Sequence, residues 1–339
     1  MTVELSGTDT AIHVNSNTPL THEDSIRMLR EMMRIRTAEE TIADLYKEQE
    51  MRTPTHFSIG QEAVAVGVSD VLTRQDVAYS GHRCHAHYLA KGGDLNAMVA
   101  ELYGKETGTA RGRGGSVHLS APEVGFIASS AILGQTMAVA TGSAWTFAMD
   151  GLRHVAVCFF GDGAIEEGIF HETLNFASVK HVPVVFVCEN NGYSTHTPLE
   201  VRQPRGTTIW QRAQCYQMPS QFVDGNNVFA VRRAAQEAVQ WARDGKGPYF
   251  LEFSTYRWRE HVGPNWDYEA GYRTKAEVDS WIERCPIERA KRELVGAGAC
   301  TAAQIATWQV EIQREVDVAV EAAKAAPFPS VEHLLDGTY

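Results

Sequence analysis

One stretch of the sequence, residues 155–193, constrains the fold more than any other. It begins with an apolar run, Val155–Phe160, that ends in the glycine-rich turn Gly161–Gly163 (GDG). A helical stretch follows, and a second apolar run, Val184–Cys188, ends in Glu189–Tyr193 (ENNGY). Two short apolar runs separated by an amphipathic helix predict one βαβ unit.

The two strands of this unit are expected to be parallel, because crossovers of this kind are right-handed and return the chain to the same sheet. Their carboxyl ends then meet at one edge, about 5 Å apart, or about 10 Å apart with one strand between them. Asp162 and Asn191 therefore project into one crevice. Carboxylate and amide oxygens are hard ligands that suit Mg²⁺ carrying a phosphorylated ligand. GDG and NNG are each common turns, so the prediction rests on their positions after two strands of one unit.

The common nucleotide-binding fingerprints are absent. The pattern G-x-G-x-x-G requires a glycine where Glu166 stands, and no G-x-x-x-x-G-K-[ST] loop occurs. Asp162 lies between the two glycines, where a carboxylate repels a bare phosphate. A cation between the carboxylate and the phosphate removes that repulsion, so the pattern indicates a metal-bridged diphosphate.

Composition and charge exclude several classes of protein. The 339 residues are 44% hydrophobic and 22% charged, which is ordinary for a globular chain, and the net charge of −11 argues against nucleic acid as the main partner. No apolar run approaches the ~20 residues that span a bilayer, and the N-terminus lacks a signal-peptide pattern. Six cysteines form no CxxC pair, and Cys158 and Cys188 fall in the predicted strands. We expect no disulfides and a cytoplasmic location.

The whole chain predicts an α/β fold, a mainly parallel sheet flanked by helices, with helical N- and C-terminal extensions. We expect a loose arm over residues 1–22, a single domain over 23–326 and a tail over 327–339. Helices are predicted over Glu23–Glu50, Gly134–Met149, Val228–Arg243 and, with interruptions near Pro286 and Gly296–Gly298, residues 275–326. A further strand is predicted at Tyr249–Thr255, a glycine-rich loop at Lys105–Ser116, turns and short helices over Thr53–Leu89, and irregular segments over Gly192–Gly225.

Further motifs extend the pattern along most of the chain: HFSIGQEA (56–63), HRCHAH (82–87), GRGGSVH (112–118), AILG (131–134), VDG (223–225), GKGP (245–248), TYR (255–257) and YRT (272–274). GDG followed at this distance by ENNGY resembles the thiamin diphosphate-binding motif. Over roughly residues 23–325 the chain resembles the alpha subunit of the dehydrogenase component of 2-oxo acid (pyruvate or branched-chain) and acetoin dehydrogenase complexes. The resemblance implies the thiamin diphosphate-binding fold.

The resemblance also implies a site for thiamin diphosphate and Mg²⁺. Asp162 and Asn191 would give side-chain oxygens to the metal, and Tyr193 would give its backbone carbonyl. Gly163 and Ala164 would offer backbone N–H groups to the diphosphate at a helix N-terminus.

Three more residues match cofactor contacts of the family. Arg83 matches a diphosphate-binding arginine, a role that suits a guanidinium fork. Ala131 and Leu133 match positions whose backbone holds the aminopyrimidine. The Leu133 side chain either helps to wedge the two cofactor rings into a bent shape or packs in the core.

Three histidines are the catalytic candidates. His56 precedes GQEA and matches a family histidine near the substrate, where an imidazole can donate a proton to an acyl oxygen. His261 matches one near the diphosphate and the reactive carbon, and so counts among the cofactor-binding residues as well. His85 lies either near the active centre or in a structural role. A zinc site within HRCHAH is the alternative that the family match disfavours.

The chain departs from the family at two places. Glu166-Glu167 follow GDG where many relatives have Asn-Gln; two carboxylates there either oppose an anion or act as first-turn helix acids. REHVGP (259–264) stands where a His-Gly-His stretch is common. This loop lacks the serines that regulate animal pyruvate dehydrogenases, so control by their phosphorylation is not expected.

The resemblance implies an enzyme that decarboxylates a 2-oxo acid or cleaves acetoin and transfers the acyl group to a lipoyl domain. In that family the acid that activates the cofactor comes from a beta subunit. Glu62, Glu172 and Glu189 are available acids, but no pattern places one beside the pyrimidine. We therefore expect an alpha2beta2 heterotetramer, with a lipoyl-bearing acyltransferase as a further partner. The alternatives are a two-subunit thiamin diphosphate-dependent carboligase that uses a non-lipoyl acceptor and a non-catalytic scaffold.

Overall fold

The computed structural model describes residues 20–333, 335 and 336, so the N-terminal arm expected over residues 1–22 lies almost entirely outside the described residues. Within them, six strands form one parallel sheet in the order β2-β1-β3-β4-β8-β7. The strands are β1 (Val77–Ser80), β2 (Phe126–Ser129), β3 (Ala156–Gly161), β4 (Val184–Asn190), β7 (Ser220–Asp224) and β8 (Tyr249–Ser254). Two short strands, β5 (Tyr193–Ser194) and β6 (Thr197–Pro198), pair separately. The predicted parallel α/β fold is confirmed.

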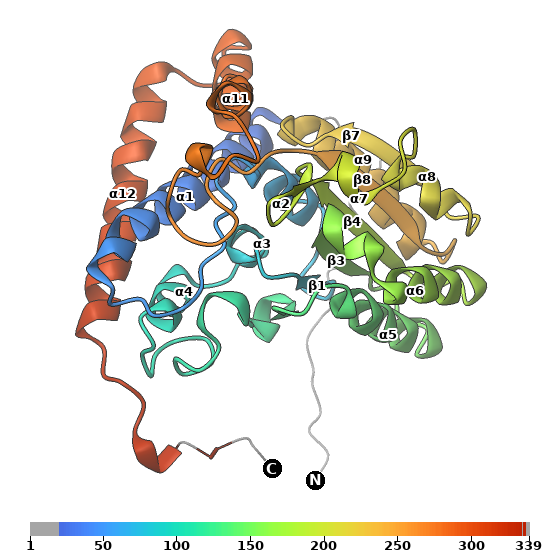
Figure 1. Ribbon diagram of the computed structural model, residues 1–339, viewed down its shortest axis with the longest axis horizontal. Coiled ribbons are helices and arrows are strands. Elements are labelled where there is room, and N and C mark those ends of the chain that lie inside the picture. The colour runs from blue at the N-terminus through green and yellow to red at the C-terminus, as the bar shows by residue number, and fades with distance from the viewer. Residues whose placement is uncertain (1–19, 334, 337–339) are drawn as a thin grey trace.

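Helices cover both faces of this sheet (Figure 1). Alternate residues of a strand point to opposite faces. Val157 and Phe159 of β3 accordingly enter a large core with helices α1, α2, α9 and α12, whereas Cys158 and Phe160 enter a smaller core with α5, α6 and α8. Burial on both faces explains the nearly continuous apolar runs of β3 and β4.

The helices and their bounds are α1 (His22–Leu45), α2 (Glu62–Ser69), α3 (His85–Ala90), α4 (Leu95–Leu102), α5 (Gln135–Met149), α6 (Gly168–Val179), α7 (Leu199–Arg202), α8 (Ile209–Gln214), α9 (Val228–Arg243), α10 (Lys275–Ile282), α11 (Pro286–Gly296) and α12 (Ala302–Ala325). The long helices α1 and α12 pack side by side although they lie at opposite ends of the chain (Figure 1). Each begins with a capping box, made by Thr21 and Asp24 in α1 and by Thr301 and Gln304 in α12. These caps explain why the terminal helices start where they do.

Strands β1, β2 and β7 were not predicted. They are only four or five residues long, and β7 is half-exposed, so they lack the apolar run that marks β3 and β4.

The helix expected directly after GDG is also different. Residues Asp162–Glu166 form a short 3-10 helix, and α6 starts only at Gly168, so Gly163 and Ala164 lie in a tighter turn than an α-helix N-terminus.

None of the helices among the described residues is long and apolar enough to cross a membrane.

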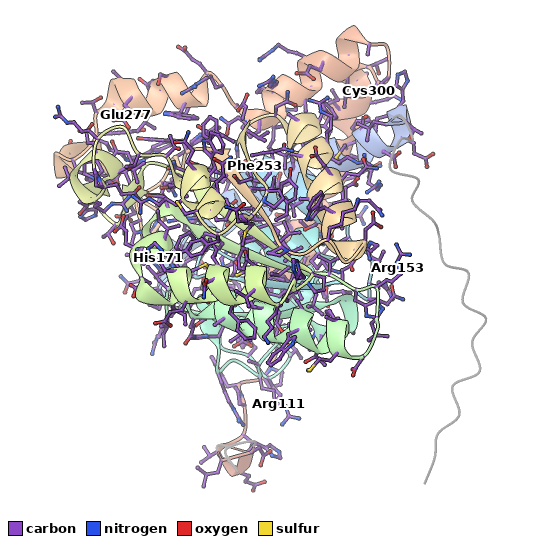
Figure 2. All side chains as sticks on the ribbon, turned by 90° about the vertical axis from the view of Figure 1, so that its right-hand side faces the viewer. Arg111, Arg153, His171, Phe253, Glu277 and Cys300 are labelled. Carbon is purple, nitrogen blue, oxygen red and sulfur yellow. The ribbon has the colours of Figure 1, made fainter. Side chains whose placement is uncertain are left out.

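All six cysteines are free thiols, which confirms the expectation of no disulfides. The C-terminal tail contains a 3-10 turn, Val331–His333, and it lies beside the glycine-rich loop near Arg111 (Figure 2). Arg113 of that loop donates hydrogen bonds to the carbonyls of His333 and Asp336.

Candidate functional site

A cavity of about 290 Å³ opens at the carboxyl edge of the sheet, where β1, β3 and β4 end. Strand β3 pairs directly with β4, with Gly161 opposite Glu189, and this register brings the turns that follow the two strands together. Ten residues predicted from the sequence line the cavity: His56, Arg83, Ala131, Leu133, Asp162, Gly163, Ala164, Asn191, Tyr193 and His261. His85 is not among the lining residues.

Asp162 is a buried carboxylate whose side chain is only 1% exposed. Its counter-charge is Arg202, at the end of α7, which forms ion pairs with both Asp162 and Glu166. Burial raises the pKa of Asp162, and the Arg202 guanidinium offsets part of that rise. Glu166 is thus paired rather than directed at the cavity, and Glu167 is exposed at the start of α6. The two acids therefore do not oppose an anion in the cavity.

Asn191 is held at the end of β4 by two side-chain hydrogen bonds. Its Oδ1 accepts the backbone N–H of Tyr193 over 3.1 Å, and its Nδ2 donates to Oε1 of Gln61 over 3.2 Å. The phenol of Tyr193 donates to Glu277 over 2.8 Å, so this ring is anchored outside the turn. Gln61 also lines the cavity, and its role was not predicted.

Arg83 is a buried cation without an acidic partner. Its guanidinium donates to the backbone carbonyls of Phe57 and His261, and no carboxylate of the described residues lies at ion-pair distance. Burial, together with the nearby Arg257, lowers its pKa to about 9. A buried charge is costly unless it is paired, so this arrangement favours an anionic ligand at Arg83.

Two further features shape the cavity. The backbone of Gly163 is closely approached by Ser194, and a Cβ at Gly163 would lie 2.6 Å from the Ser194 hydroxyl, so a larger residue there requires the Ser194 side chain to move. Leu133 is 36% exposed and lines the cavity, which favours a ligand contact over the core-packing alternative.

Three histidines meet on one wall of the cavity. The ring centroids of His56 lie 4.3 Å from His82 and 5.0 Å from His261, and the last two are 5.3 Å apart. Burial is the main cause that lowers their pKa values, to about 2 for His56, about 3 for His82 and about 4 for His261. All three imidazoles are therefore neutral at neutral pH. His82 lies within the HRCHAH motif, but its sequence position did not distinguish it from the neighbouring histidines.

The other histidines of HRCHAH point elsewhere. His85 is fully buried, with Nε2 2.8 Å from the Ser116 hydroxyl and Nδ1 3.3 Å from the Glu39 carboxylate. His87 lies 2.8 Å from the Ser80 hydroxyl and 3.3 Å from Glu189. These contacts favour the structural alternative for His85. His85 and His87 therefore contact different groups. A zinc site within the motif would need the two imidazoles to share one ion, so these contacts do not fit it.

The acids near the site differ in availability. Glu62 is held by Arg36 at 2.5 Å and by the backbone N–H of Gly60, and Glu172 is exposed on α6. Of the three acids considered from the sequence, Glu189 alone lines the cavity, and it lies beside His87.

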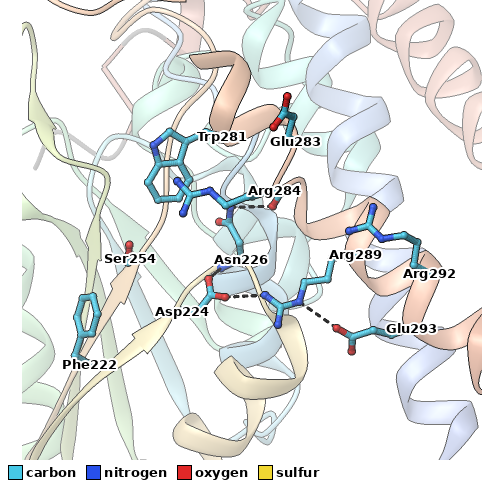
Figure 3. A pocket seen from close by; sticks show the side chains of 10 residues that line it. All are labelled: Phe222, Asp224, Asn226, Ser254, Trp281, Glu283, Arg284, Arg289, Arg292 and Glu293. Atoms are coloured by element: carbon cyan, nitrogen blue, oxygen red, sulfur yellow. Dashed lines mark hydrogen bonds and ion pairs between the residues drawn. The ribbon is translucent and has the colours of Figure 1, made fainter. Parts of the chain in front are cut away.

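A second hollow, of about 530 Å³, lies at the ends of β7 and β8 (Figure 3). Arg289 there forms ion pairs with Asp224 at 2.7 Å and Glu293 at 3.0 Å, and Arg284 covers the ring of Trp281. Three charged residues of this hollow therefore pair with one another, and none of the site residues predicted from the sequence lines it.

Comparisons with known proteins agree on one family. The family model described as "Dehydrogenase E1 component" matches residues 30–332. The alpha subunit of acetoin:2,6-dichlorophenolindophenol oxidoreductase from Bacillus subtilis is 38% identical, over 94% of this chain and 95% of that protein. The pyruvate dehydrogenase E1 component subunit alpha from Rhizobium meliloti is 36% identical, over 92% and 89%. The mitochondrial counterpart from Saccharomyces cerevisiae is 34% identical, over 91% and 72%.

Proposed function

Because the chain belongs to the dehydrogenase E1 component family, we propose that it is the alpha subunit of a thiamin diphosphate- and Mg²⁺-dependent dehydrogenase. The substrate class is a 2-oxo acid or acetoin, in line with the names of its relatives. One observation carries the proposal: a buried cation without an acidic partner, Arg83, shares a cavity with the oxygen ligands Asp162 and Asn191. That combination suits a diphosphate bridged to a divalent metal.

The residues of this cavity fit both groups. Asp162 and Asn191 offer the hard oxygen atoms that Mg²⁺ takes in proteins, and the backbone carbonyl of Tyr193 adds a third. Arg83 offers a guanidinium that lacks an anion. Gly163 and Ala164 line the cavity in the 3-10 turn after β3, where their backbone N–H groups would be offered to a diphosphate.

Thiamin diphosphate, when bound, supplies a nucleophilic carbon and an electron sink for cleavage next to a carbonyl. The chain's own residues hold it and manage protons. Arg83 would bind and orient the diphosphate, and Ala131 and Leu133, which also line the cavity, would hold the rings. The neutral imidazoles of His56 and His261 hold a proton on one ring nitrogen, and each can donate it as a hydrogen bond to the acyl oxygen of the substrate.

A second subunit is required to complete this site. Glu62 and Glu172 do not line the cavity; of the acids that do, Asp162 is assigned to the metal and Glu189 lies next to His87. Exposed apolar residues also occur near the lining in sequence: Ile132, between the lining residues Ala131 and Leu133, is 63% exposed, and Val139 of α5 is 53% exposed. Exposed apolar surface of this kind marks a protein interface. Both features support a beta subunit in an alpha2beta2 heterotetramer that brings the missing carboxylate.

The acceptor and the location are proposed on separate grounds. A lipoyl domain of an acyltransferase is the proposed acceptor, since the relatives include alpha subunits of pyruvate dehydrogenase E1 components. The comparisons do not favour the two-subunit carboligase, because the relatives named here are acetoin and pyruvate enzymes. Six free thiols support a reducing, cytoplasmic location.

The test is co-expression with the beta subunit, followed by titration with thiamin diphosphate in the presence and absence of Mg²⁺. Binding should require the metal, and Asp162→Ala should abolish that requirement together with tight binding. Pyruvate, branched-chain 2-oxo acids and acetoin are then compared for turnover with and without a lipoyl domain, by CO₂ release for the 2-oxo acids and acetaldehyde release for acetoin. A complex that binds no thiamin diphosphate in the presence of Mg²⁺ would rule out the proposal.

A further inference from the structure

We propose that Arg202 serves as the counter-cation of Asp162 while the divalent cation is absent. When the divalent cation binds, Arg202 releases Asp162 and keeps only its ion pair with Glu166. This inference rests on the proposed function, because it takes Asp162 as a metal ligand. It assigns a role to two residues, Arg202 and Glu166, that are not themselves metal ligands in that proposal. The Arg202–Glu166 pair would thereby set the affinity of the site for its metal.

The contacts of Arg202 use all three nitrogens of its side chain. Nη2 pairs with Oδ2 of Asp162, Nη1 pairs with Oε1 of Glu166, and Nε donates to the carbonyl of Thr197 over 3.0 Å. The Arg202 side chain is only 9% exposed. One guanidinium therefore bridges the first and last residues of the 3-10 turn Asp162–Glu166, and it lies beside Gly163, where an added Cβ would be 3.8 Å from Nη1.

A divalent cation and this guanidinium compete for the same carboxylate. A metal bound to Asp162 must sit about 2 Å from a carboxylate oxygen. With Arg202 still hydrogen-bonded to Oδ2, two positive groups would face each other across one carboxylate in a water-poor pocket, where charges are weakly screened. Release of Asp162 by Arg202 removes this repulsion. The exchange also leaves the buried carboxylate neutralised in both states.

Glu166 is built to keep Arg202 after that release. Its Oε1 also accepts a hydrogen bond from Nε2 of Gln203 over 3.2 Å, and Gln203 in turn accepts from Arg212 over 3.0 Å. These contacts hold the Glu166 carboxylate in place without help from Asp162. The Nε bond to Thr197 anchors the other side of the guanidinium, so only the Nη2 contact has to break.

The experiment measures Mn²⁺ binding to the co-expressed complex, in the presence of thiamin diphosphate, from the electron paramagnetic resonance signal of free Mn²⁺. We expect Arg202→Met to tighten Mn²⁺ binding by about tenfold or more, because the metal no longer displaces a cation. The control is Arg153→Met, which removes a positive charge that pairs with Asp244 and touches neither Asp162 nor Glu166. It should change the affinity by less than about threefold.

A double-mutant cycle separates the exchange from a general charge effect. Glu166→Gln should weaken Mn²⁺ binding in the wild-type background, because Arg202 loses the carboxylate that receives it. In the Arg202→Met background the same change should have little effect. Equal effects in both backgrounds, or an Arg202→Met variant that binds Mn²⁺ no more tightly than wild type, would overturn the inference. Arg202→Gln serves if the methionine variant does not fold; a glutamine also lacks the charge that competes for Asp162, so it too should tighten binding.

Failure of the inference and failure of the proposed function give different results. If Asp162→Asn abolishes Mn²⁺ binding while Arg202→Met leaves it unchanged, the metal site stands and the exchange does not. If Asp162→Asn binds Mn²⁺ as tightly as wild type, the metal assignment itself is wrong, whatever the Arg202 variants do.

Discussion

The side-chain amide of Asn191 donates a hydrogen bond to Oε1 of Gln61 over 3.2 Å, although 130 residues separate the two in sequence. Gln61 precedes α2, and Asn191 follows β4, so this bond joins two elements at the cavity. It orients the Asn191 side chain, whose Oδ1 points to the turn that begins at Tyr193 and accepts the backbone N–H of that residue. Gln61 is therefore a positioning residue for a proposed metal ligand.

Gln61→Ala should weaken metal-dependent binding of thiamin diphosphate without abolishing it. Loss of one neutral hydrogen bond costs about 1 kcal/mol, which corresponds to about a fivefold rise in the dissociation constant. Calorimetric titration of the complex measures this change. Gln221→Ala is the control, because Gln221 also makes a single side-chain hydrogen bond, to Tyr249, away from the cavity. Equal effects of the two substitutions would show that Gln61 does not position Asn191.

Arg83→Met should separate cofactor binding from stability. The buried guanidinium has two carbonyl partners and no carboxylate among the described residues, so the apoprotein keeps this charge at a cost. We expect the methionine variant to unfold at a higher temperature without cofactor, with a gain of about 1–2 kcal/mol. Its affinity for thiamin diphosphate should fall by at least about 100-fold, because charge-assisted hydrogen bonds are lost.

A matched substitution sharpens this test. Arg257 is also buried, but it lies 3.5 Å from Asp267 and donates to Thr195 over 2.8 Å. Arg257→Met removes one of the two cationic partners of the buried Asp267, the other being Arg273, and should lower the unfolding temperature. If both methionine variants destabilise the apoprotein alike, Arg83 is not an unpaired charge that awaits an anion.

The three cavity histidines make stability depend on pH in the acid range. Their pKa values in the folded protein are about 2 for His56, about 3 for His82 and about 4 for His261, whereas an unfolded histidine titrates near 6.5. The unfolded chain therefore binds more protons between these values, and folding becomes less favourable as the pH falls. Above pH 6.5 the three rings are neutral in the folded and the unfolded chain and do not lower the stability. Below pH 6.5 they lower it progressively, as the pH falls toward the folded-state pKa values of about 4 for His261 and about 3 for His82.

Denaturant unfolding of the apoprotein at pH 8 and pH 5 measures this dependence. After allowance for solvent screening, His82→Gln should recover about 1 kcal/mol of the stability lost at pH 5. At pH 8 the imidazole is neutral in both states, so any difference there reports packing alone and is subtracted. If wild type and His82→Gln lose the same stability between pH 8 and pH 5, burial of His82 is not the cause of that loss.

The sequence contained enough information to predict the parts of the site that follow buried strands. The apolar runs of β3 and β4 end in glycine- and asparagine-rich turns, and parallel pairing then forces Asp162 and Asn191 to one edge. Helix α9 was predicted with the bounds that it has, Val228–Arg243, because its apolar residues recur at a regular helical spacing. These features depend on local periodicity, which a single sequence displays.

The missing parts depend on contacts between distant segments. Arg202 lies 40 residues from Asp162, in a stretch without periodicity, so no local pattern marks it as the partner of Asp162. The histidines of HRCHAH differ only in the direction of their side chains, and that direction is set by the turn before α3. His82 consequently faces the cavity while His85 is buried against Ser116.

Glu101 organises the glycine-rich loop through four backbone hydrogen bonds. One carboxylate oxygen accepts from Ala110 and Gly112 over 2.8 and 2.9 Å, and the other accepts from Gly114 and Gly115 over 2.7 and 3.0 Å. In Glu101→Gln an NH₂ group faces two N–H donors. The loss of two buried bonds should destabilise the chain by about 2–4 kcal/mol.

Hydrogen exchange measured over residues 105–116 checks this effect, because exchange should accelerate there first. The change should reach the cavity through Ser116, which ends this loop and precedes Val117, a residue that lines the cavity. Glu106→Gln is the control, since Glu106 belongs to the same loop and forms one ion pair, with Arg111 at 3.6 Å. If hydrogen exchange over residues 105–116 is as fast in wild type as in Glu101→Gln, the four hydrogen bonds do not hold the loop.

The outer face of α5 should be part of the contact with the beta subunit. Val139 is 53% exposed and Met149 is 63% exposed, on a helix whose start borders the cavity at Leu133 and Gly134. A charge placed in an apolar interface loses its hydration without gaining a partner. Val139→Glu should therefore convert most of the co-expressed heterotetramer into separate subunits, as measured by light scattering after size-exclusion chromatography, while far-ultraviolet circular dichroism of the chain stays unchanged. Val310→Glu on α12, where the valine is 71% exposed, should leave assembly intact. A heterotetramer that survives Val139→Glu with wild-type affinity would exclude this face of α5 from the subunit interface.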